Sequence, residues 1–179
     1  MINEFCSRVK PSNNNAKKLF YALLCAAAVI TSVYLIIPNY KGIVGLFSVC
    51  AIVGAVLVYT KYIGVEYYYE ITHDTAGSPL FLVTQTIGKR STTLCRIDLH
   101  TIVKVEKMST EERGRHKTER GYKKYSYLPT LMPKEALLIT VRSPHENAEI
   151  FIEAGDDFRS LLSAYAYEAR ENRFENEEY

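Results

Sequence analysis

Residues 19–37 have the sequence LFYALLCAAAVITSVYLII, and residues 43–60 have the sequence IVGLFSVCAIVGAVLVYT. Neither stretch contains a charged residue, and only the short segment PNYKG (residues 38–42) separates them. At about 1.5 Å of rise per residue, each stretch forms a helix nearly long enough to cross a hydrocarbon layer of about 30 Å. The sequence therefore predicts a transmembrane hairpin over residues 19–60.

Two other interpretations of the hairpin fit the sequence less well. A secretory signal peptide has an apolar core of about 7–15 residues followed by a small-residue cleavage site, whereas the first stretch is longer and lacks such a site. A hairpin buried in a soluble protein needs a large apolar partner surface, which the rest of the chain does not offer. Neither stretch contains Asp, Glu, Lys, Arg or His, which argues against a transporter or channel and favours an anchor.

The flanking charges predict how the hairpin is oriented. The basic residues ahead of the first stretch are Arg8, Lys10, Lys17 and Lys18. The connecting turn contains only Lys41, and Lys61 follows the second stretch. Because cytoplasmic flanks carry an excess of Lys and Arg, we expect a cell membrane protein with both termini in the cytoplasm. Residues 1–18 contain few apolar side chains, so we expect a flexible polar tail.

The periodicity changes to two after Gly64, which predicts strands. Seven strands are expected, over residues 66–72, 80–87, 92–97, 101–108, 125–128, 135–142 and 148–153. Residues 109–124 are expected to form a long charged loop. An apolar stripe at helical spacing then predicts a helix over residues 156–172, and residues 174–179 are expected to form an acidic tail.

These elements predict an α+β fold. The N-terminal transmembrane hairpin is followed, over residues 64–173, by a seven-stranded antiparallel curved sheet or barrel with a C-terminal capping helix. No helix is expected between the strands, so a parallel α/β fold is disfavoured.

The order of seven strands and one helix resembles pleckstrin-homology-like (PH-like) domains, and the preceding hairpin is similar to bacterial membrane proteins that carry such a domain. The matching stretches are YYYEIT (residues 67–72) and RIDLHTIVKV (residues 96–105). The resemblance implies an interaction scaffold. Phosphoinositide-binding members use basic residues around the first hairpin turn, whereas residues 74–79 here contain no Lys or Arg. The resemblance therefore does not imply inositol-phosphate binding.

Composition excludes several other functions. The net charge of +2 is too small to indicate a nucleic-acid partner. Cys95 is the only cysteine of the segment after the hairpin, so we expect no disulfide framework there. The four histidines fall at spacings that match no metal-site template, and no catalytic motif occurs. We therefore expect no metal, no cofactor and no enzymatic activity.

The candidate binding site is a basic cluster in and around the expected loop. Its members are Lys107, Arg113, Arg115, Lys117, Arg120, Lys123 and Lys124. Such a cluster on a tethered domain can contact anionic lipid headgroups or an acidic partner. The alternative is a solvated loop without a ligand, because runs of charge are commonly just solvated.

The sequence thus predicts a non-catalytic interaction module that presents a PH-like domain at the cytoplasmic face of a membrane, for contact with a protein or with anionic lipid. The alternative is an accessory subunit of a larger membrane transporter or enzyme complex, which docks through the hairpin. Binding of the hairpin alone to a multi-span protein would favour that alternative. The sequence does not identify the partner.

Overall fold

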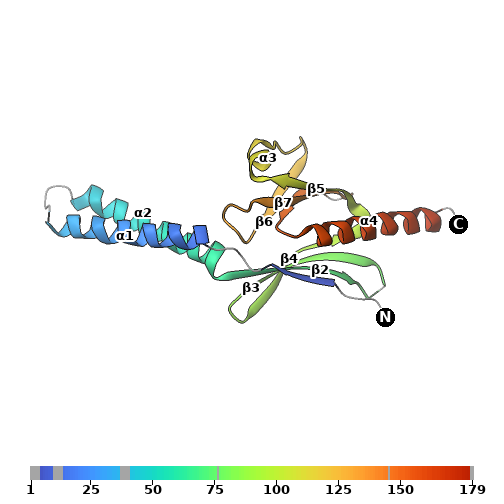
Figure 1. Ribbon diagram of the computed structural model, residues 1–179, viewed down its shortest axis with the longest axis horizontal. Coiled ribbons are helices and arrows are strands. Elements are labelled where there is room, and N and C mark those ends of the chain that lie inside the picture. The colour runs from blue at the N-terminus through green and yellow to red at the C-terminus, as the bar shows by residue number, and fades with distance from the viewer. Residues whose placement is uncertain (1–4, 10–13, 37–40, 76, 145, 178–179) are drawn as a thin grey trace. The chain divides into compact units, whose positions relative to one another are not determined.

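The computed structural model describes residues 5–9, 14–36, 41–75, 77–144 and 146–177 (Figure 1). The chain divides into two compact units, one formed by Pro11–Val65 and the other by Met1–Lys10 with Glu66–Tyr179. The first is a pair of apolar helices and the second is an α+β domain. Each unit is described by itself.

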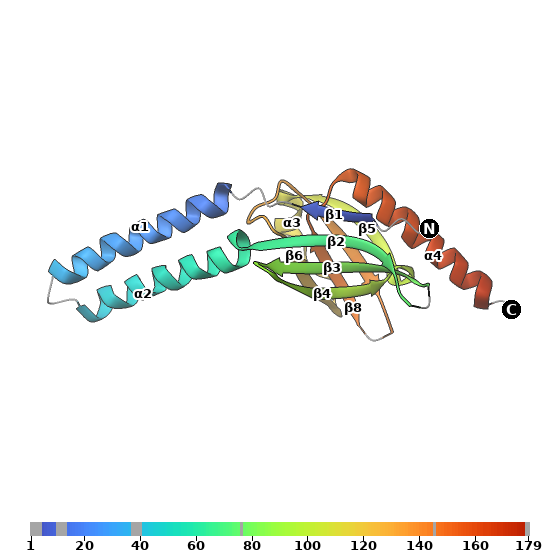
Figure 2. The ribbon, with the colours of Figure 1, turned by 90° about the horizontal axis from the view of Figure 1, so that it is seen from below.

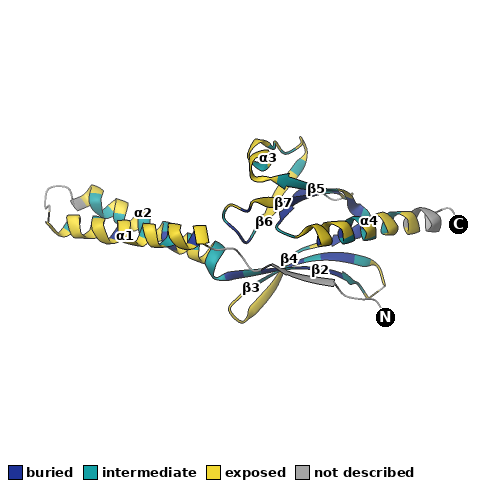
Figure 3. Cartoon of the chain, viewed as in Figure 1, coloured by how far each residue is buried: buried dark blue, intermediate teal, exposed yellow. Residues whose placement is uncertain are grey.

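The helical unit contains the two predicted apolar helices. Helix α1 comprises Asn14–Ile36, and helix α2 comprises Lys41–Val58 and continues into one π-helical turn, η2 (Tyr59–Ile63). Both are long and apolar enough to cross a membrane. Helix α1 begins at Asn14, more than one turn before the predicted Leu19. Its first turn therefore carries mostly polar side chains. Most described residues of these two helices are exposed (Figure 3).

Helices α1 and α2 approach each other beside two glycines, at distances where a Cβ atom would make ordinary contacts. A Cβ atom on Gly45 would lie 3.5 Å from the Tyr34 ring, and one on Gly54 would lie 3.6 Å from Leu23. The hydroxyl groups of Thr31 and Ser48 form a hydrogen bond of 2.8 Å between the two helices. The two apolar helices therefore pack against each other. An apolar groove of about 330 Å³ between them is lined by Phe20, Leu24, Ile52, Ala55, Val56 and Tyr59.

Within the described residues, the domain contains eight strands and two α-helices. The strands are β1 (Phe5–Val9), β2 (Val65–His73), β3 (Pro79–Ile87), β4 (Arg90–Asp98), β5 (Ile102–Ser109), β6 (Tyr122–Tyr127), β7 (Glu135–Arg142) and β8 (Asn147–Ile152). The helices are α3 (Thr110–Arg115) and α4 (Asp156–Glu177), and a 3-10 turn, η3 (Leu99–Thr101), precedes β5. Strands β2 to β8 confirm the seven predicted strands.

The prediction of one sheet of seven antiparallel strands is wrong. The strands form two sheets, in the orders β1-β2-β3-β4 and β5-β7-β8-β6, and β6 pairs with β8 in parallel (Figure 2). Residues 128–134 connect β6 to β7, and Pro129 and Pro133 among them cannot donate a backbone hydrogen bond to a strand ladder, so the two strands do not continue into a hairpin. Strand β6 can therefore pair at the far side of β8 instead of beside β7.

The prediction of a flexible tail is wrong for residues 5–9. These residues form β1, which pairs antiparallel with β2 from Phe5 opposite Ile71 to Val9 opposite Tyr67. The backbone groups at the edge of β2 supply the hydrogen bonds, so this short segment becomes ordered through a partner distant in sequence. Residues 1–4 and 10–13 lie outside the described residues.

Two further predictions change at the helices. The expected loop over residues 109–124 contains helix α3 and the first residues of β6. Helix α4 begins at the predicted Asp156 but continues to Glu177, so the backbone of most of the expected acidic tail is helical. Acidic residues at its start, Asp156 and Asp157, complement the positive end of the helix dipole.

The core lies between the two sheets and is closed by α4 (Figures 1 and 3). Phe158 of α4 contacts Tyr69 and Phe81 of the first sheet, with ring centroids 6.3 Å and 6.1 Å apart. The Tyr69 hydroxyl donates to the Tyr127 carbonyl at 2.6 Å and accepts from the Glu153 amide at 3.3 Å. This one side chain thus connects β2 to the second sheet.

Candidate functional site

Residues 110–121, here called the α3–β6 segment, cover the outer face of the second sheet. The edge of the His116 ring packs against Phe151 of β8 at 5.8 Å between centroids, and the Lys124 ammonium lies 4.8 Å from the centre of the Phe151 ring. Consequently both faces of β8 are buried from Ala148 to Ile152. Glu149 and Phe151, which alternate with the buried Ala148, Ile150 and Ile152, are therefore buried as well.

Helix α3 is held at its start by a capping box. The Ser109 amide donates to the Glu112 carboxylate at 2.7 Å, and the Glu112 amide donates to the Ser109 hydroxyl at 3.2 Å. Hydrogen bonds from the Ser109 amide and hydroxyl hold the pKa of Glu112 below its ordinary value. The Thr110 hydroxyl also donates to the Pro133 carbonyl at 2.6 Å. The pattern Ser-x-x-Glu is visible in the sequence, and it was the available signal for this helix.

The end of the segment is fixed by a buried carboxylate. Glu149 is only 2% exposed. One of its oxygens lies 2.7 Å from Nε2 of His116, and the other accepts from the Glu119 amide at 3.1 Å. Burial alone would raise the pKa of Glu149, but the hydrogen bonds from His116 and Glu119 outweigh burial and lower it. The carboxylate therefore stays charged at neutral pH and anchors the segment.

Three of the seven predicted basic residues are engaged within the domain. The Lys107 ammonium lies 2.8 Å from Glu135 and 3.0 Å from Asp156. Lys123 pairs with Glu146 at 2.7 Å. Together with Lys124 on the Phe151 ring, these residues have partners of their own, so the structure does not bring them into one site with the rest.

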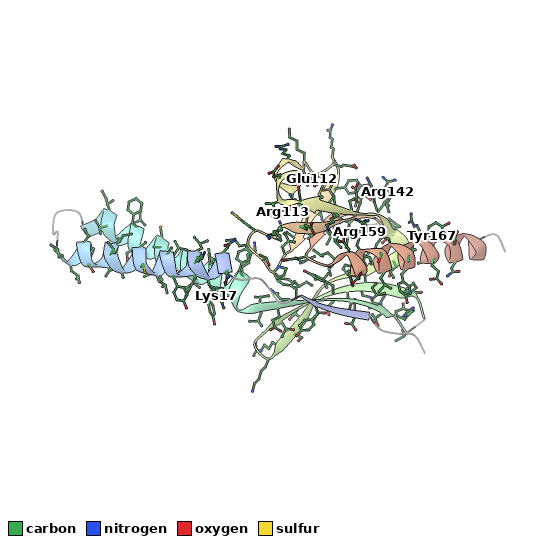
Figure 4. All side chains as sticks on the ribbon, in the orientation of Figure 1. Lys17, Glu112, Arg113, Arg142, Arg159 and Tyr167 are labelled. Carbon is green, nitrogen blue, oxygen red and sulfur yellow. The ribbon has the colours of Figure 1, made fainter. Side chains whose placement is uncertain are left out.

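The other four basic residues lie in the α3–β6 segment. They are Arg113, Arg115, Lys117 and Arg120. In the described part of the chain, none of the four lies within 4.0 Å of a carboxylate oxygen. Among the described residues, the buried Nη1 of Arg113 has no hydrogen-bond partner. The Arg113 side chain is labelled in Figure 4. The segment also contains Glu111, Glu112 and Glu119, of which Glu112 is engaged in the cap and Glu119 donates its amide to Glu149.

A second concave feature lies between β4 and the second sheet. This groove has a volume of about 360 Å³ and a floor of Ile97, Val141, Ala148 and Ile150. Cys95 lines it, and burial raises the pKa of this thiol to about 11 although a hydrogen bond with the Tyr127 hydroxyl lowers it. The thiol is therefore protonated at neutral pH, which is unfavourable for nucleophilic catalysis. Across the ranges that the structure describes, no three His, Cys, Asp or Glu side chains gather as a metal site.

No protein-family model, curated protein or solved structure matches the chain significantly. The resemblance to PH-like domains and to bacterial membrane proteins therefore stays a prediction from the sequence. The candidate sites are defined by their own geometry alone.

Proposed function

We propose that this chain is a non-catalytic, membrane-anchored interaction module whose α3–β6 segment contacts the phosphate groups of anionic lipids. The observation that supports an anchored module is the way the apolar helices join the domain. Strand β1 ends at Val9 shortly before α1 begins at Asn14, and β2 begins at Val65 directly after η2 ends at Ile63. The hairpin is therefore connected to two neighbouring strands of one sheet.

The chemistry of the segment supports an anionic ligand. Guanidinium groups donate paired hydrogen bonds to phosphate oxygens, and the segment carries three of them. Each basic residue close to an anionic surface contributes about 1 kcal/mol. Because Glu149 holds the segment in one conformation, little further ordering is needed for contact.

Amide hydrogen exchange of the full chain in nanodiscs tests this contact. We expect residues 110–121 to exchange at least about tenfold more slowly with anionic phosphatidylglycerol than with neutral phosphatidylcholine, given about 1 kcal/mol for each basic residue. Replacing the three exposed cations Arg115, Lys117 and Arg120 with glutamine should abolish the difference. The matched control replaces Lys89, Arg90 and Arg159, which are exposed outside residues 110–121, and should retain it.

Two outcomes would overturn the proposed lipid contact. One is an equal rate of amide exchange of residues 110–121 in the two lipids. Slowing by a soluble acidic peptide, with no effect of the lipid, is the other, and it would assign the segment to an acidic protein partner.

We further propose that both termini lie in the cytoplasm. The excess of Lys and Arg on the outer flanks of the hairpin supports this orientation. The pairing of β1 with β2 supports placing both flanks on the same side of the membrane. A short peptide tag before Met1 and another after Tyr179 should both be protected from added protease in intact cells and cleaved after lysis. Cleavage of either tag in intact cells would contradict the proposal.

A further inference from the structure

The free edge of β4 forms one wall of the groove described above. Strand β4 is the last strand of its sheet, and in the described residues it pairs only with β3. A register shift between Val83 and Thr84 leaves Leu94 of β4 without an opposite residue, and Leu94 lies at the groove. An edge strand presents unpaired N–H and C=O groups, to which an extended peptide can add as a further strand.

The opposite wall of the groove comes from the second sheet. Strand β6 is itself an edge strand, and its Tyr125 and Tyr127 rings stack with centroids 6.3 Å apart. The Tyr125 hydroxyl donates to Glu146 at 2.6 Å, which fixes this ring. Between the walls, the apolar floor and the volume of about 360 Å³ suit one apolar side chain of an added strand.

Two charged residues of β4 at the edge of the groove determine which residues of an added strand can flank its apolar side chain. Arg96 and Asp98 are both exposed, and they lie on the same face of β4, on either side of the inward-facing Ile97. The nearest carboxylate oxygen to Arg96 belongs to Asp74 at 3.9 Å, and the Arg96 side chain is 61% exposed. In the described part of the chain, no ion pair involves Asp98. Residues directly opposite on neighbouring strands interact, so the rim complements a carboxylate opposite Arg96 and a cation opposite Asp98.

We propose that this groove binds an extended peptide segment of a partner protein, added antiparallel to β4, with the order basic residue, apolar residue, acidic residue. The antiparallel direction is the more stable pairing. It places the basic residue opposite Asp98, the apolar residue opposite Ile97 and above the groove floor, and the acidic residue opposite Arg96. This site is separate from the α3–β6 segment, so the inference goes beyond the proposed function and does not depend on it.

Two blocked peptides of equal composition test the proposal on the full chain in detergent micelles. One has Lys-Leu-Glu at its centre and the other has Glu-Leu-Lys, each between three threonines on either side. By fluorescence anisotropy, we expect the first peptide to bind about three- to tenfold more tightly, since cross-strand charge pairs contribute roughly 0.2–1 kcal/mol each. The double variant Arg96→Asp, Asp98→Arg should reverse this preference.

A matched control is present on another edge strand. Lys104 and Glu106 of β5 also stand two residues apart, have side chains that are 60% and 41% exposed, and form an ion pair of 2.6 Å. Exchanging these two charges should leave the preference between the peptides unchanged. Loss of the preference in this control variant would overturn the assignment to β4.

Cys95 provides an independent readout in the groove itself. Bound Lys-Leu-Glu peptide should slow alkylation of Cys95 and leave the rates at Cys25 and Cys50 of the hairpin unchanged. Binding of neither peptide, tighter binding of Glu-Leu-Lys by the unmodified chain, or binding without protection of Cys95 would each overturn the proposal.

Discussion

Replacing Phe158 with alanine is expected to lower the free energy of unfolding of the domain by about 3–5 kcal/mol. Phe158 is 2% exposed and contacts both Tyr69 and Phe81. Among the residues of α4 whose burial is described, the buried ones are Phe158, Leu162 and Ala166. Removing the ring leaves a cavity where the helix meets the first sheet, so the packing of α4 against that sheet is weakened.

Denaturation of the full chain in detergent checks this expectation. Near-ultraviolet circular dichroism follows the tyrosines, which dominate the signal because the chain contains 14 of them and no tryptophan. Tyr167→Ala, on the same helix, is the control because Tyr167 is 59% exposed and should have little effect (Figure 4). A loss of stability for Phe158→Ala no larger than for this control would show that α4 is not part of the core.

Replacing Glu149 with leucine is expected to cost about 3 kcal/mol of unfolding free energy. The substitution removes the acceptor of both the His116 imidazole and the Glu119 amide, which leaves buried polar groups without partners. We also expect faster hydrogen exchange in residues 110–121, because this carboxylate anchors their end. Glu149→Gln retains an acceptor oxygen and should lose less stability.

The effect of Glu149 depends on pH in a defined direction. The folded state lowers the pKa of this carboxyl below its ordinary value of 4.5, so its ionised form stabilises the fold. The contribution is complete above pH 4.5 and is lost as the pH falls through the lower pKa of the folded state. The difference between the unmodified chain and Glu149→Leu should therefore shrink below pH 4.5. A difference that grows on acidification would contradict the assigned role of the carboxylate.

The sequence predicts the elements of this fold better than their arrangement. Alternation within β2 to β8 is a local property, so each strand is recognisable from its own residues. Which strands become neighbours depends on connections and on contacts distant in sequence. For this reason the parallel pairing of β6 with β8 and the pairing of β1 with β2 were missed.

The candidate site shows the same limit. Composition identifies the basic residues, but only the tertiary structure shows that Lys107 and Lys123 have carboxylate partners and that Arg115 has none among the described residues. The burial of Glu149 could not be read from β8, because the residues that cover it come from the α3–β6 segment. The capping box at Ser109 is different, since its Ser-x-x-Glu pattern is a local signal for the start of a helix.

The position of β1 has a consequence for biosynthesis. Residues 5–9 leave the ribosome before the apolar helices, and their partner β2 leaves after them. In a chain that inserts as proposed, a single crossing would leave these two strands on opposite sides of the membrane. Only when α2 also crosses the membrane does β2 reach the side on which β1 lies. Completion of the first sheet therefore depends on correct insertion, and a misinserted chain keeps an open sheet edge that quality-control proteases and chaperones can recognise.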